Sequence, residues 1–579
     1  MRRRDVNRLG LALLGLGASG RVAWGREAGL TPGAYFDRLE AFGLSGGGFV
    51  IEGGQTVWSR AVGWSDKAAM RRFDARTAFN IASITKTMTA LTVLSLAAEG
   101  TLSPGDPVSR FLPEAPEAKG AITLGQLMSH TSALPRDVRR PAGSLDKAAM
   151  LAPIWDAETA SAPGERFNYS NEGYRLLAAV IEAADGRSYR EAVRARVFGP
   201  AGMTDSGFIQ EPPPGRDLAQ GYVAWGGLGD FRTTQRLGWN EGAGNVVSTL
   251  DDMARFARAI QSGRIIPADW LAQAQSKQSP DAGTTGYLGY GWGWYIGALA
   301  SGAPLIVHAG DNPGYHDELR WYPQADRWIY VISTRDLYDD SGQSLGLHVG
   351  RIGANLSRMR TGVAFEPPPP GQRIDLADGR GLGGDFATSD GAIRLYRVDP
   401  ADPHLTAIAL GQEAANALTG ASPEDAARLA AINDKTIGLA RNIAKMDTTG
   451  LRTQLGDLAF FAAGWVNDMR GWVEAHGAFT GFGPITSRET PLTDQVRTWL
   501  PFRFERGEAL MEFTWNGEAL YESLTETGTP SSVVLPVARL EDGGLVAWDM
   551  VTNARVTMQP TSRGLRIGDG TYSRTQSGS

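Results

Sequence analysis

The chain of 579 residues contains no cysteine, which excludes disulfide bonds, thiolate metal ligands and a cysteine nucleophile. Lysine is also scarce, with 7 among the 57 basic residues. Arginine keeps its charge in proteins, whereas a desolvated lysine can lose its proton and act as a base. No apolar run reaches the roughly 20 residues that a membrane-spanning helix needs.

The remaining composition is typical of a folded, acidic protein. Hydrophobic residues make up 42% of the chain and charged residues 21%, so large hydrophobic cores can form and disorder of the whole chain is excluded. The formal net charge is −6, and residues 1–25 hold five arginines against one aspartate, so the rest of the chain is more acidic still. This charge argues against nucleic acid as a partner.

Residues 1–25 have the pattern of an export signal. Arginines at positions 2–4 precede a short apolar run, 9–18, and small residues follow. This order is typical of a secretory signal, and the arginine pair resembles a bacterial twin-arginine signal; a disordered basic tail is the alternative. We therefore expect a periplasmic or secreted bacterial protein that has no integral membrane segment once the signal is removed.

The pattern of residues 26–362 predicts one α+β domain. Two strand patterns, 47–52 and 55–62, flank Gly53-Gly54 and indicate a hairpin. Helical periodicity marks 82–99, 124–129, 172–184 and 250–261, and later strand patterns mark 304–308, 316–322 and 327–333. We expect an antiparallel sheet flanked by helices, with an all-helical subdomain.

A proline-rich linker, 363–373, separates this domain from the rest. Its four consecutive prolines, 367–370, hold the chain extended. Residues 374–579 combine strand patterns with two amphipathic helical stretches and predict one or two accessory α+β or β-rich units. They weakly resemble a cone-shaped α+β domain inside a lipocalin-like unit. Such a region could cap a cleft, stabilise the first domain or support a homodimer.

Two serines are followed by a lysine three residues later. Ser83 and Lys86 lie at the start of an apolar helix, where positions i and i+3 share a face and the helix N-terminus supplies N–H donors. Ser144 and Lys147 have the same spacing in a polar region, which favours an N-cap serine with a solvated lysine. Ser83 and Lys86 are therefore the candidate catalytic pair.

Three further motifs carry polar groups. Tyr169 and Asn171 lie in a turn just before a helix, where an ordinary N-cap loop is the alternative. His308 ends a strand pattern; a structural histidine is the alternative, and its spacing to His316 makes a metal site improbable. Residues 342–346 match the nucleophile-elbow pattern Gly-x-Ser-x-Gly, but a polar stretch separates them from the preceding strand, so we interpret the match as coincidence.

Ser-x-x-Lys at 83–86, Tyr-x-Asn at 169–171 and His-x-Gly at 308–310, in this order, resemble the serine β-lactamase and penicillin-binding-protein superfamily. The branch they resemble is the class C β-lactamase, D-aminopeptidase and esterase group. The likeness extends over about residues 32–358. Three other stretches support it: 122–132, which ends in His130-Thr131-Ser132, 200–203 and 243–249.

The resemblance implies that Ser83 attacks a carbonyl and forms an acyl-enzyme, with Lys86 lying against both Ser83 and Tyr169. A free tyrosine ionises near pH 10, so Tyr169 needs positive charge nearby, from Lys86 or a protonated His308, to serve as a base at neutral pH. Either Tyr169 takes the Ser83 proton, or Lys86 takes it and Tyr169 relays it. The sequence leaves both routes open.

The resemblance also implies the substrate contacts. Asn171 would hold the substrate amide and help to place Lys86, and His308 and Gly310 would line the substrate. The backbone N–H groups of Ser83 and Asp311 would form the oxyanion hole, and losing one such donor typically costs about 3–4 kcal/mol. The negative Asp311 carboxylate is compatible with an oxyanion hole only if its side chain points away from the oxyanion.

One departure narrows the expected chemistry. β-Lactamases and many transpeptidases carry Lys-Thr-Gly where this chain has His308-Ala309-Gly310, so a permanent cation is replaced by a residue that is often neutral. This favours a serine hydrolase acting on D-amino-acid amides, peptides or small esters over a strong β-lactamase. We expect a small-molecule or short-peptide substrate and no cofactor. The alternatives are a sensor that acylates without turnover and a non-catalytic periplasmic scaffold.

Overall fold

The computed structural model describes residues 30–138, 146–159, 161–223, 226–227, 241–282, 287–335, 348–372, 374, 382–388, 392–396, 405–455, 461–489, 495–516, 519–526, 534–549, 554–562, 564–568 and 570–575. The expected export signal, Ser144 and the motif at 342–346 lie outside the described residues. Within these ranges, no helix combines the length and the apolar character that crossing a membrane requires.

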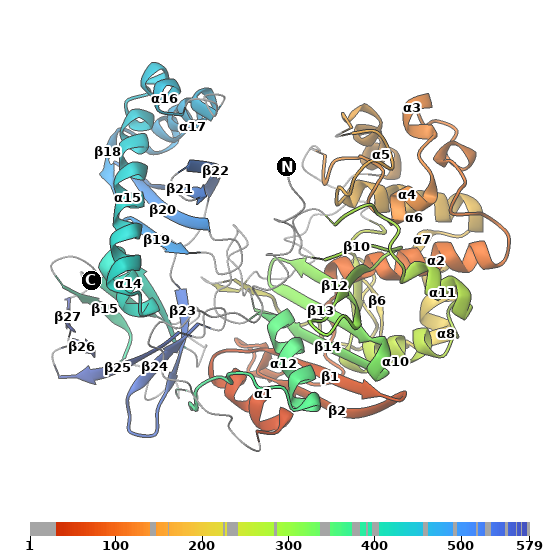
Figure 1. The fold of residues 1–579 in the computed structure, drawn as a ribbon, viewed down its shortest axis with the longest axis horizontal. Helices are drawn as coiled ribbons and strands as arrows, with labels where there is room; N and C mark the ends of the chain where they lie inside the picture. Colours follow the sequence, from red (N-terminus) through yellow and green to blue (C-terminus); the bar gives the residue numbers. More distant parts are fainter. Residues whose placement is uncertain are drawn as a thin grey trace.

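Among the described residues, seven strands form the central antiparallel sheet of the first domain (Figure 1). In sheet order they are β10 (Gly289–Tyr290), β11 (Tyr295–Ala298), β12 (Pro304–Asn312), β13 (Tyr315–Tyr322), β14 (Arg327–Ser333), β1 (Gly46–Glu52) and β2 (Gln55–Val62). Alternate side chains of β1 face opposite sides, because the period of a strand is two. Phe49 and Ile51 join the core on one side and Val50 joins the core on the other, so both faces of the sheet are covered.

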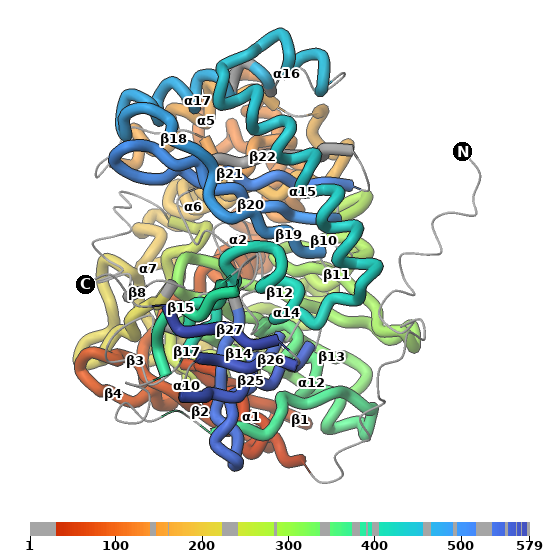
Figure 2. Tube along the Cα trace, turned by 90° about the vertical axis from the view of Figure 1, so that its left-hand side faces the viewer, coloured from red at the N-terminus to blue at the C-terminus, as the bar shows by residue number. Residues whose placement is uncertain are grey.

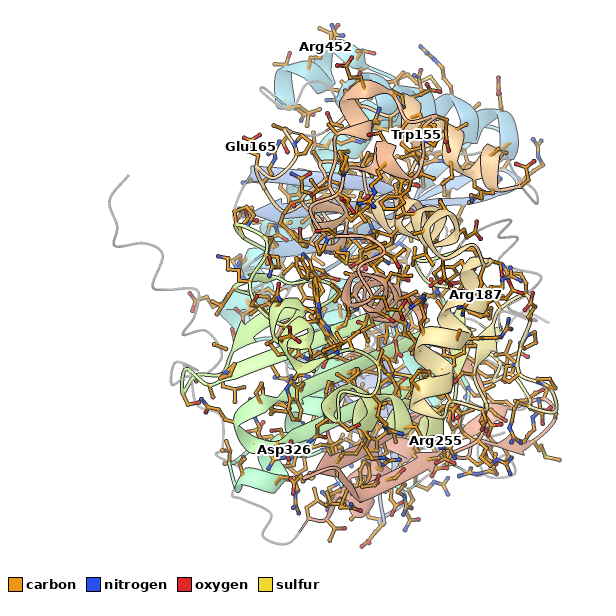
Figure 3. The ribbon with its side chains drawn as sticks, turned by 90° about the vertical axis from the view of Figure 1, so that its right-hand side faces the viewer. Trp155, Glu165, Arg187, Arg255, Asp326 and Arg452 are labelled. Atoms are coloured by element: carbon orange, nitrogen blue, oxygen red, sulfur yellow. The ribbon has the colours of Figure 1, made fainter. Side chains whose placement is uncertain are left out.

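Helices cover both faces of the sheet. α1 (Pro32–Ala41) and α12 (Val349–Thr361) pack on one face. The other face carries the helical subdomain, seen from its own side in Figure 3. Its helices are η1 (Ala82–Ile84), α2 (Thr85–Ala98), η2 (Val108–Arg110), α3 (Glu117–Gly120), α4 (Leu124–Met128), α5 (Lys147–Asp156), α6 (Asn171–Asp185), α7 (Tyr189–Val193), η3 (Arg194–Phe198), α8 (Gly199–Ala201), α10 (Leu250–Gln261) and α11 (Ala268–Ala274). The predicted α+β class, with an antiparallel sheet and a helical subdomain, is confirmed.

The other short strands that the structure describes in the first domain form three small sheets apart from the central one. They are β3 (Trp64–Asp66), β4 (Arg71–Arg72), β5 (Phe79–Asn80), β6 (Gly207–Phe208), β7 (Tyr222–Val223), β8 (Gly226–Gly227) and β9 (Val246–Ser248). β9 pairs with both β5 and β6. This small sheet brings the segment before Ser83 against residues 246–248, so the entry to α2 is fixed by strand pairing.

The strand predicted over 304–308 is longer in the structure. β12 continues to Asn312 because Gly310 and Asp311 pair with Asp317 and His316 of β13. The His308-Ala309-Gly310 motif therefore lies within a strand and not at its end. Cross-strand pairing of this kind is set by a partner strand and leaves no local signal in the sequence.

The C-terminal region contains a closed barrel of eight strands among the described residues. They are β15 (Gly384–Ala387), β16 (Ala392–Tyr396), β17 (Leu405–Leu410), β23 (Val534–Arg539), β24 (Leu545–Trp548), β25 (Arg555–Thr561), β26 (Gly564–Ile567) and β27 (Gly570–Arg574). The chain leaves the barrel after β17 and returns at β23, so the barrel is assembled from two separate stretches of sequence.

The residues between β17 and β23 form an inserted unit of helices and a second antiparallel sheet. Its elements are α14 (Gln412–Thr419), α15 (Pro423–Ala444), α16 (Thr448–Leu455), α17 (Phe461–His476), β18 (Phe479–Phe482), β19 (Thr486–Glu489), β20 (Gln495–Phe504), β21 (Gly507–Asn516) and β22 (Ala519–Glu526). Figure 2 shows α15 running from the barrel along this sheet. α14 contributes Ala414, Ala415 and Leu418 to the core of the barrel, so it joins the two parts.

The barrel packs against the first domain on the side of α1 and α12. Trp548 of β24 lies with its ring centroid 5.2 Å from that of Phe42, in a shared hydrophobic core. A guanidinium N–H of Arg335 donates to the hydroxyl of Thr406 at 3.1 Å. The contact between Trp548 and Phe42 lies on the opposite face of the sheet from the helical subdomain, so the barrel supports the sheet on that face.

A buried ion pair connects the inserted unit to the barrel. Arg488 of β19 pairs with Asp549, which follows β24, and their side chains are 6% and 0% exposed. Removing one partner of such a pair leaves the other charge buried and unpaired in a medium of low dielectric constant. The pair therefore ties the position of the inserted sheet to the end of the barrel strand.

We expect Asp549→Ala to lower the free energy of unfolding by about 3–5 kcal/mol, because the Arg488 charge stays buried without its counter-ion. The measurement is urea unfolding followed by circular dichroism and tryptophan fluorescence. Glu508→Ala is the matched control, because it breaks a pair with Arg503 in which both side chains are 48% exposed. That exposed pair is worth about 1 kcal/mol or less, and equal losses in the two variants would contradict the prediction.

Candidate active site

Ser83 and Lys86 lie at the junction of η1 and α2, where the sequence pattern placed them. The turn is held by Asn80, whose side chain donates to the carbonyl of Val246 at 2.8 Å and accepts from the backbone N–H of Ala82 at 3.1 Å. Ser83 is half-buried, whereas Lys86 is fully buried. The Lys86 amine lies 2.9 Å from the Ser83 hydroxyl and donates to the carbonyl of Ala243 at 2.7 Å.

Tyr169 completes this group from a distant segment. Its phenol is hydrogen-bonded to the Ser83 side chain, and the Lys86 amine lies 5.0 Å from the centroid of its ring. Lys86 also lies 5.7 Å from the ring of Tyr174 on α6. The three predicted residues of the catalytic set thus meet at one place, as their motifs predicted.

His130 holds the Tyr169 loop in position. Its ring lies against that of Tyr169, with centroids 4.2 Å apart, and its Nδ1 accepts the backbone N–H of Ser170 at 3.0 Å. Its backbone has a φ of +56°, which is uncommon for a residue other than glycine and marks a constrained turn. In the sequence, His130 was only a landmark of the resemblance, and its role depends on packing against Tyr169, which lies 39 residues away.

Burial sets the ionisation of the central groups. Loss of water around Lys86 lowers the pKa of its amine well below the ordinary value, and the charges of Arg175 and Arg136 act in the same direction. Burial raises the pKa of the Tyr169 phenol, and its hydrogen bond with Ser83 offsets only part of that rise. The neutral forms of both groups are therefore favoured.

His308 does not supply positive charge at neutral pH. It is fully buried, and loss of water together with the nearby Lys86 lowers its pKa to about 3. Its Nε2 is 2.8 Å from the hydroxyl of Tyr290 and its Nδ1 is 2.8 Å from the carbonyl oxygen of Ala309. In the neutral ring, Nδ1–H donates to that carbonyl and Nε2 accepts from the phenol.

Gly310 allows β12 to approach the turn that carries Ser83. A Cβ at this position would lie 2.6 Å from the carbonyl oxygen of Ile81 and 2.0 Å from Oδ1 of Asp317, so a side chain cannot be accommodated. Asp311 is the next residue, and its side chain lies on the other face of the strand. Oδ1 of Asp311 is 2.6 Å from Nδ1 of His316, within hydrogen-bond distance. The Asp311 carboxylate is therefore engaged by a partner on β13, while its backbone lies beside Gly310.

The side chain of Asn171 is held by Asp137, which no motif in the sequence marked. Its Nδ2 donates to the two carboxylate oxygens of Asp137 at 3.1 and 3.0 Å. Asp137 also forms an ion pair with Arg175, at 3.3 Å. Arg175 forms a second ion pair with the buried Glu172, at 2.9 Å. These bonds fasten residues 135–138 to the start of α6.

Comparison with known proteins places these residues in a common family. A family model described as Beta-lactamase matches residues 40–354. Esterase EstB of Burkholderia gladioli is 30% identical over 307 residues, covering 45% of this chain and 77% of the esterase. D-alanyl-D-alanine-carboxypeptidase/endopeptidase AmpH of Escherichia coli (strain K12) is 29% identical over 309 residues, covering 49% of this chain and 78% of that protein.

A solved structure shares the fold of the first domain. The D-amino acid amidase from Ochrobactrum anthropi SV3, complexed with L-phenylalanine, has a TM-score of 0.50 and 22% identity and covers 57% of this chain and 98% of the amidase chain. The family model spans more than half of the chain and includes Ser83, Lys86, Tyr169 and His308. The chain therefore belongs to the beta-lactamase family, and it is a serine hydrolase of the superfamily that includes the penicillin-binding proteins.

Proposed function

We propose that the protein hydrolyses amide or ester bonds through an acyl-enzyme on Ser83, with the neutral amine of Lys86 as the general base. The observation that carries this proposal is the fully buried amine 2.9 Å from the Ser83 hydroxyl, with its pKa lowered by burial. An amine that is neutral at working pH can accept a proton, whereas an ammonium cannot. Of the two routes that the sequence left open, this geometry supports Lys86 as the base.

In the acylation step, Oγ of Ser83 attacks the carbonyl carbon and its proton passes to the Lys86 amine. The carbonyl oxygen takes the negative charge, and the backbone N–H groups of Ser83 and Asp311 would stabilise it. The tetrahedral intermediate collapses as the leaving nitrogen or oxygen receives a proton through the Tyr169 phenol, which is replenished from Lys86. Water then attacks the carbonyl carbon of the acyl-enzyme while Lys86 and Tyr169 accept its proton. The bond to Ser83 breaks, Oγ of Ser83 takes that proton back, and the acid is released.

The substrate class we propose is an amide, peptide or ester with a small acyl part, including D-amino-acid derivatives. The names of the relatives support this range, because they include an esterase, a D-alanyl-D-alanine carboxypeptidase and a D-amino acid amidase. The neutral, buried His308 argues against the carboxylate recognition that Lys-Thr-Gly gives a β-lactamase. Because Nδ2 of Asn171 donates to Asp137, a substrate N–H would be accepted by Oδ1 of Asn171.

We also propose that the protein is exported and acts in the periplasm or outside the cell, on the pattern of residues 1–25. The barrel contacts the face of the sheet opposite the helical subdomain, which favours a stabilising role of the accessory region over a cap placed by the barrel itself. The homodimer stays a prediction.

We expect Ser83→Ala to reduce hydrolysis of short-chain p-nitrophenyl esters and D-aminoacyl p-nitroanilides by about a thousandfold or more, because the nucleophile is lost. The variant should also lose the adduct that a fluorophosphonate leaves on the wild type, as read by intact mass. Ser344→Ala, at the unrelated Gly-x-Ser-x-Gly match, is the control and should keep full activity and labelling. A wild-type acyl adduct that forms from the ester or anilide substrate and persists without product release would identify a sensor and contradict the proposal.

The pH profile tests the base. We expect kcat/KM of the wild type to fall as the pH drops through the lowered pKa of Lys86, because only the neutral amine accepts the Ser83 proton. His308 has a pKa of about 3 and stays neutral throughout, so His308→Gln should leave this acidic limb where it is. Lys86→Arg should be inactive at every pH, because arginine keeps its proton. A limb that moves with the His308 variant would refute the assignment.

A further inference from the structure

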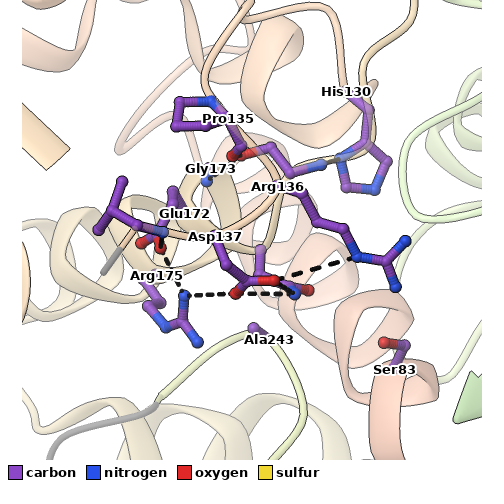
Figure 4. Close-up of polar contacts among 12 residues, drawn as sticks. Ser83, His130, Pro135, Arg136, Asp137, Glu172, Gly173, Arg175 and Ala243 are labelled. Carbon is purple, nitrogen blue, oxygen red and sulfur yellow. Dashed lines mark hydrogen bonds and ion pairs between the residues drawn. The ribbon is translucent and has the colours of Figure 1, made fainter. Parts of the chain in front are cut away.

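Arg136 places an exposed guanidinium beside the Tyr169 ring. Arg136 lies four residues after the His130-Thr131-Ser132 motif. Its Cζ lies 5.4 Å from the centroid of the Tyr169 ring. Its side chain is 74% exposed. In Figure 4 it extends from the loop toward the helix end that carries Ser83. Its charge acts on Lys86, Tyr169 and His130 alike, which places it within electrostatic reach of the whole group.

The neighbouring acid is engaged mainly by other groups. Asp137 accepts two hydrogen bonds from Asn171 and one contact from Arg175 at 3.3 Å, whereas its approach to Nε of Arg136 is 4.0 Å. Arg175 is only 9% exposed and pairs with the buried Glu172, so it is a structural cation. Arg136 therefore keeps most of its donors directed to solvent beside the reacting group.

The site has no permanent cation on β12, where β-lactamases and many transpeptidases carry Lys-Thr-Gly. His308 is neutral and its two ring nitrogens face Tyr290 and the carbonyl of Ala309. The Lys86 amine is also favoured in its neutral form. Arg136 is thus the exposed, permanent charge that the described residues place next to Tyr169.

We propose that Arg136 binds a carboxylate on the leaving-group side of the substrate, so that amides and esters with an anionic leaving amine or alcohol are preferred. This inference rests on the proposed function. A guanidinium offers a planar pair of donors that matches a carboxylate. We place the carboxylate on the leaving-group side because Arg136 lies beside Tyr169. In the proposed mechanism, the Tyr169 phenol delivers the proton to the leaving atom. The cation that recognises the anion comes from the loop at 135–138 and not from the strand.

The test uses 3- and 4-acetoxybenzoate, whose leaving phenols carry a carboxylate, and the corresponding acetoxybenzamides, whose leaving phenols are neutral. We expect Arg136→Gln to lower kcat/KM for the benzoates by about tenfold or more, mainly through KM, and to leave the benzamides within about twofold. Arg136→Lys should retain part of the preference. Raising the ionic strength should weaken the wild-type preference for the benzoates.

Arg187→Gln is the matched control, because Arg187 is an exposed arginine just past the far end of α6, about 22 Å along the helix, and is visible in Figure 3. An equal loss in this variant, an equal loss on benzoates and benzamides, or no loss in Arg136→Gln would each overturn the inference. Ser83→Ala separates the two claims. Hydrolysis that survives it would refute the proposed function, whereas a Ser83-dependent enzyme without the benzoate preference would refute only the role of Arg136.

Discussion

The contact between the Lys86 amine and the Ser83 hydroxyl depends on burial that no single segment provides. The amine is covered by the rings of Tyr169 and Tyr174 and by the carbonyl of Ala243, which come from two separate parts of the chain, 169–174 and 243. Water would restore the charge of the amine, so its exclusion is the condition for a base at this position. The packing of the helical subdomain around α2 therefore keeps the Lys86 amine neutral, and it also stabilises the fold.

The same burial acts in different directions on neighbouring groups. It lowers the pKa values of Lys86 and His308, and it raises that of Tyr169. All three groups are thereby kept neutral, which avoids unpaired charge inside a site lined by aromatic rings. The permanent charges are found at the edge, in Arg136, Asp137 and Arg175, where water and ion pairs can stabilise them.

Much of the fold could be predicted because it follows from local periodicity. The hairpin of β1 and β2, the apolar helix after Ser83 and the α10 helix all match their patterns, and three ordered motifs located Ser83, Lys86 and Tyr169. The extension of β12 was missed because it depends on pairing with β13. Arg136 and Asp137 were missed because their importance depends on Tyr169 and Asn171, which lie more than thirty residues away. The neutral state of His308 follows from tertiary burial, which a residue type alone does not give.

The split barrel determines the order in which the molecule can be completed during synthesis. Its strands β15, β16 and β17 leave the ribosome long before β23 to β27, with the inserted unit between them. The barrel cannot close until β27 has emerged, and Trp548, which covers Phe42 on the first domain, lies on a strand that follows the inserted unit. A nascent chain that stops before β23 thus carries an uncovered apolar surface, which quality-control factors can recognise.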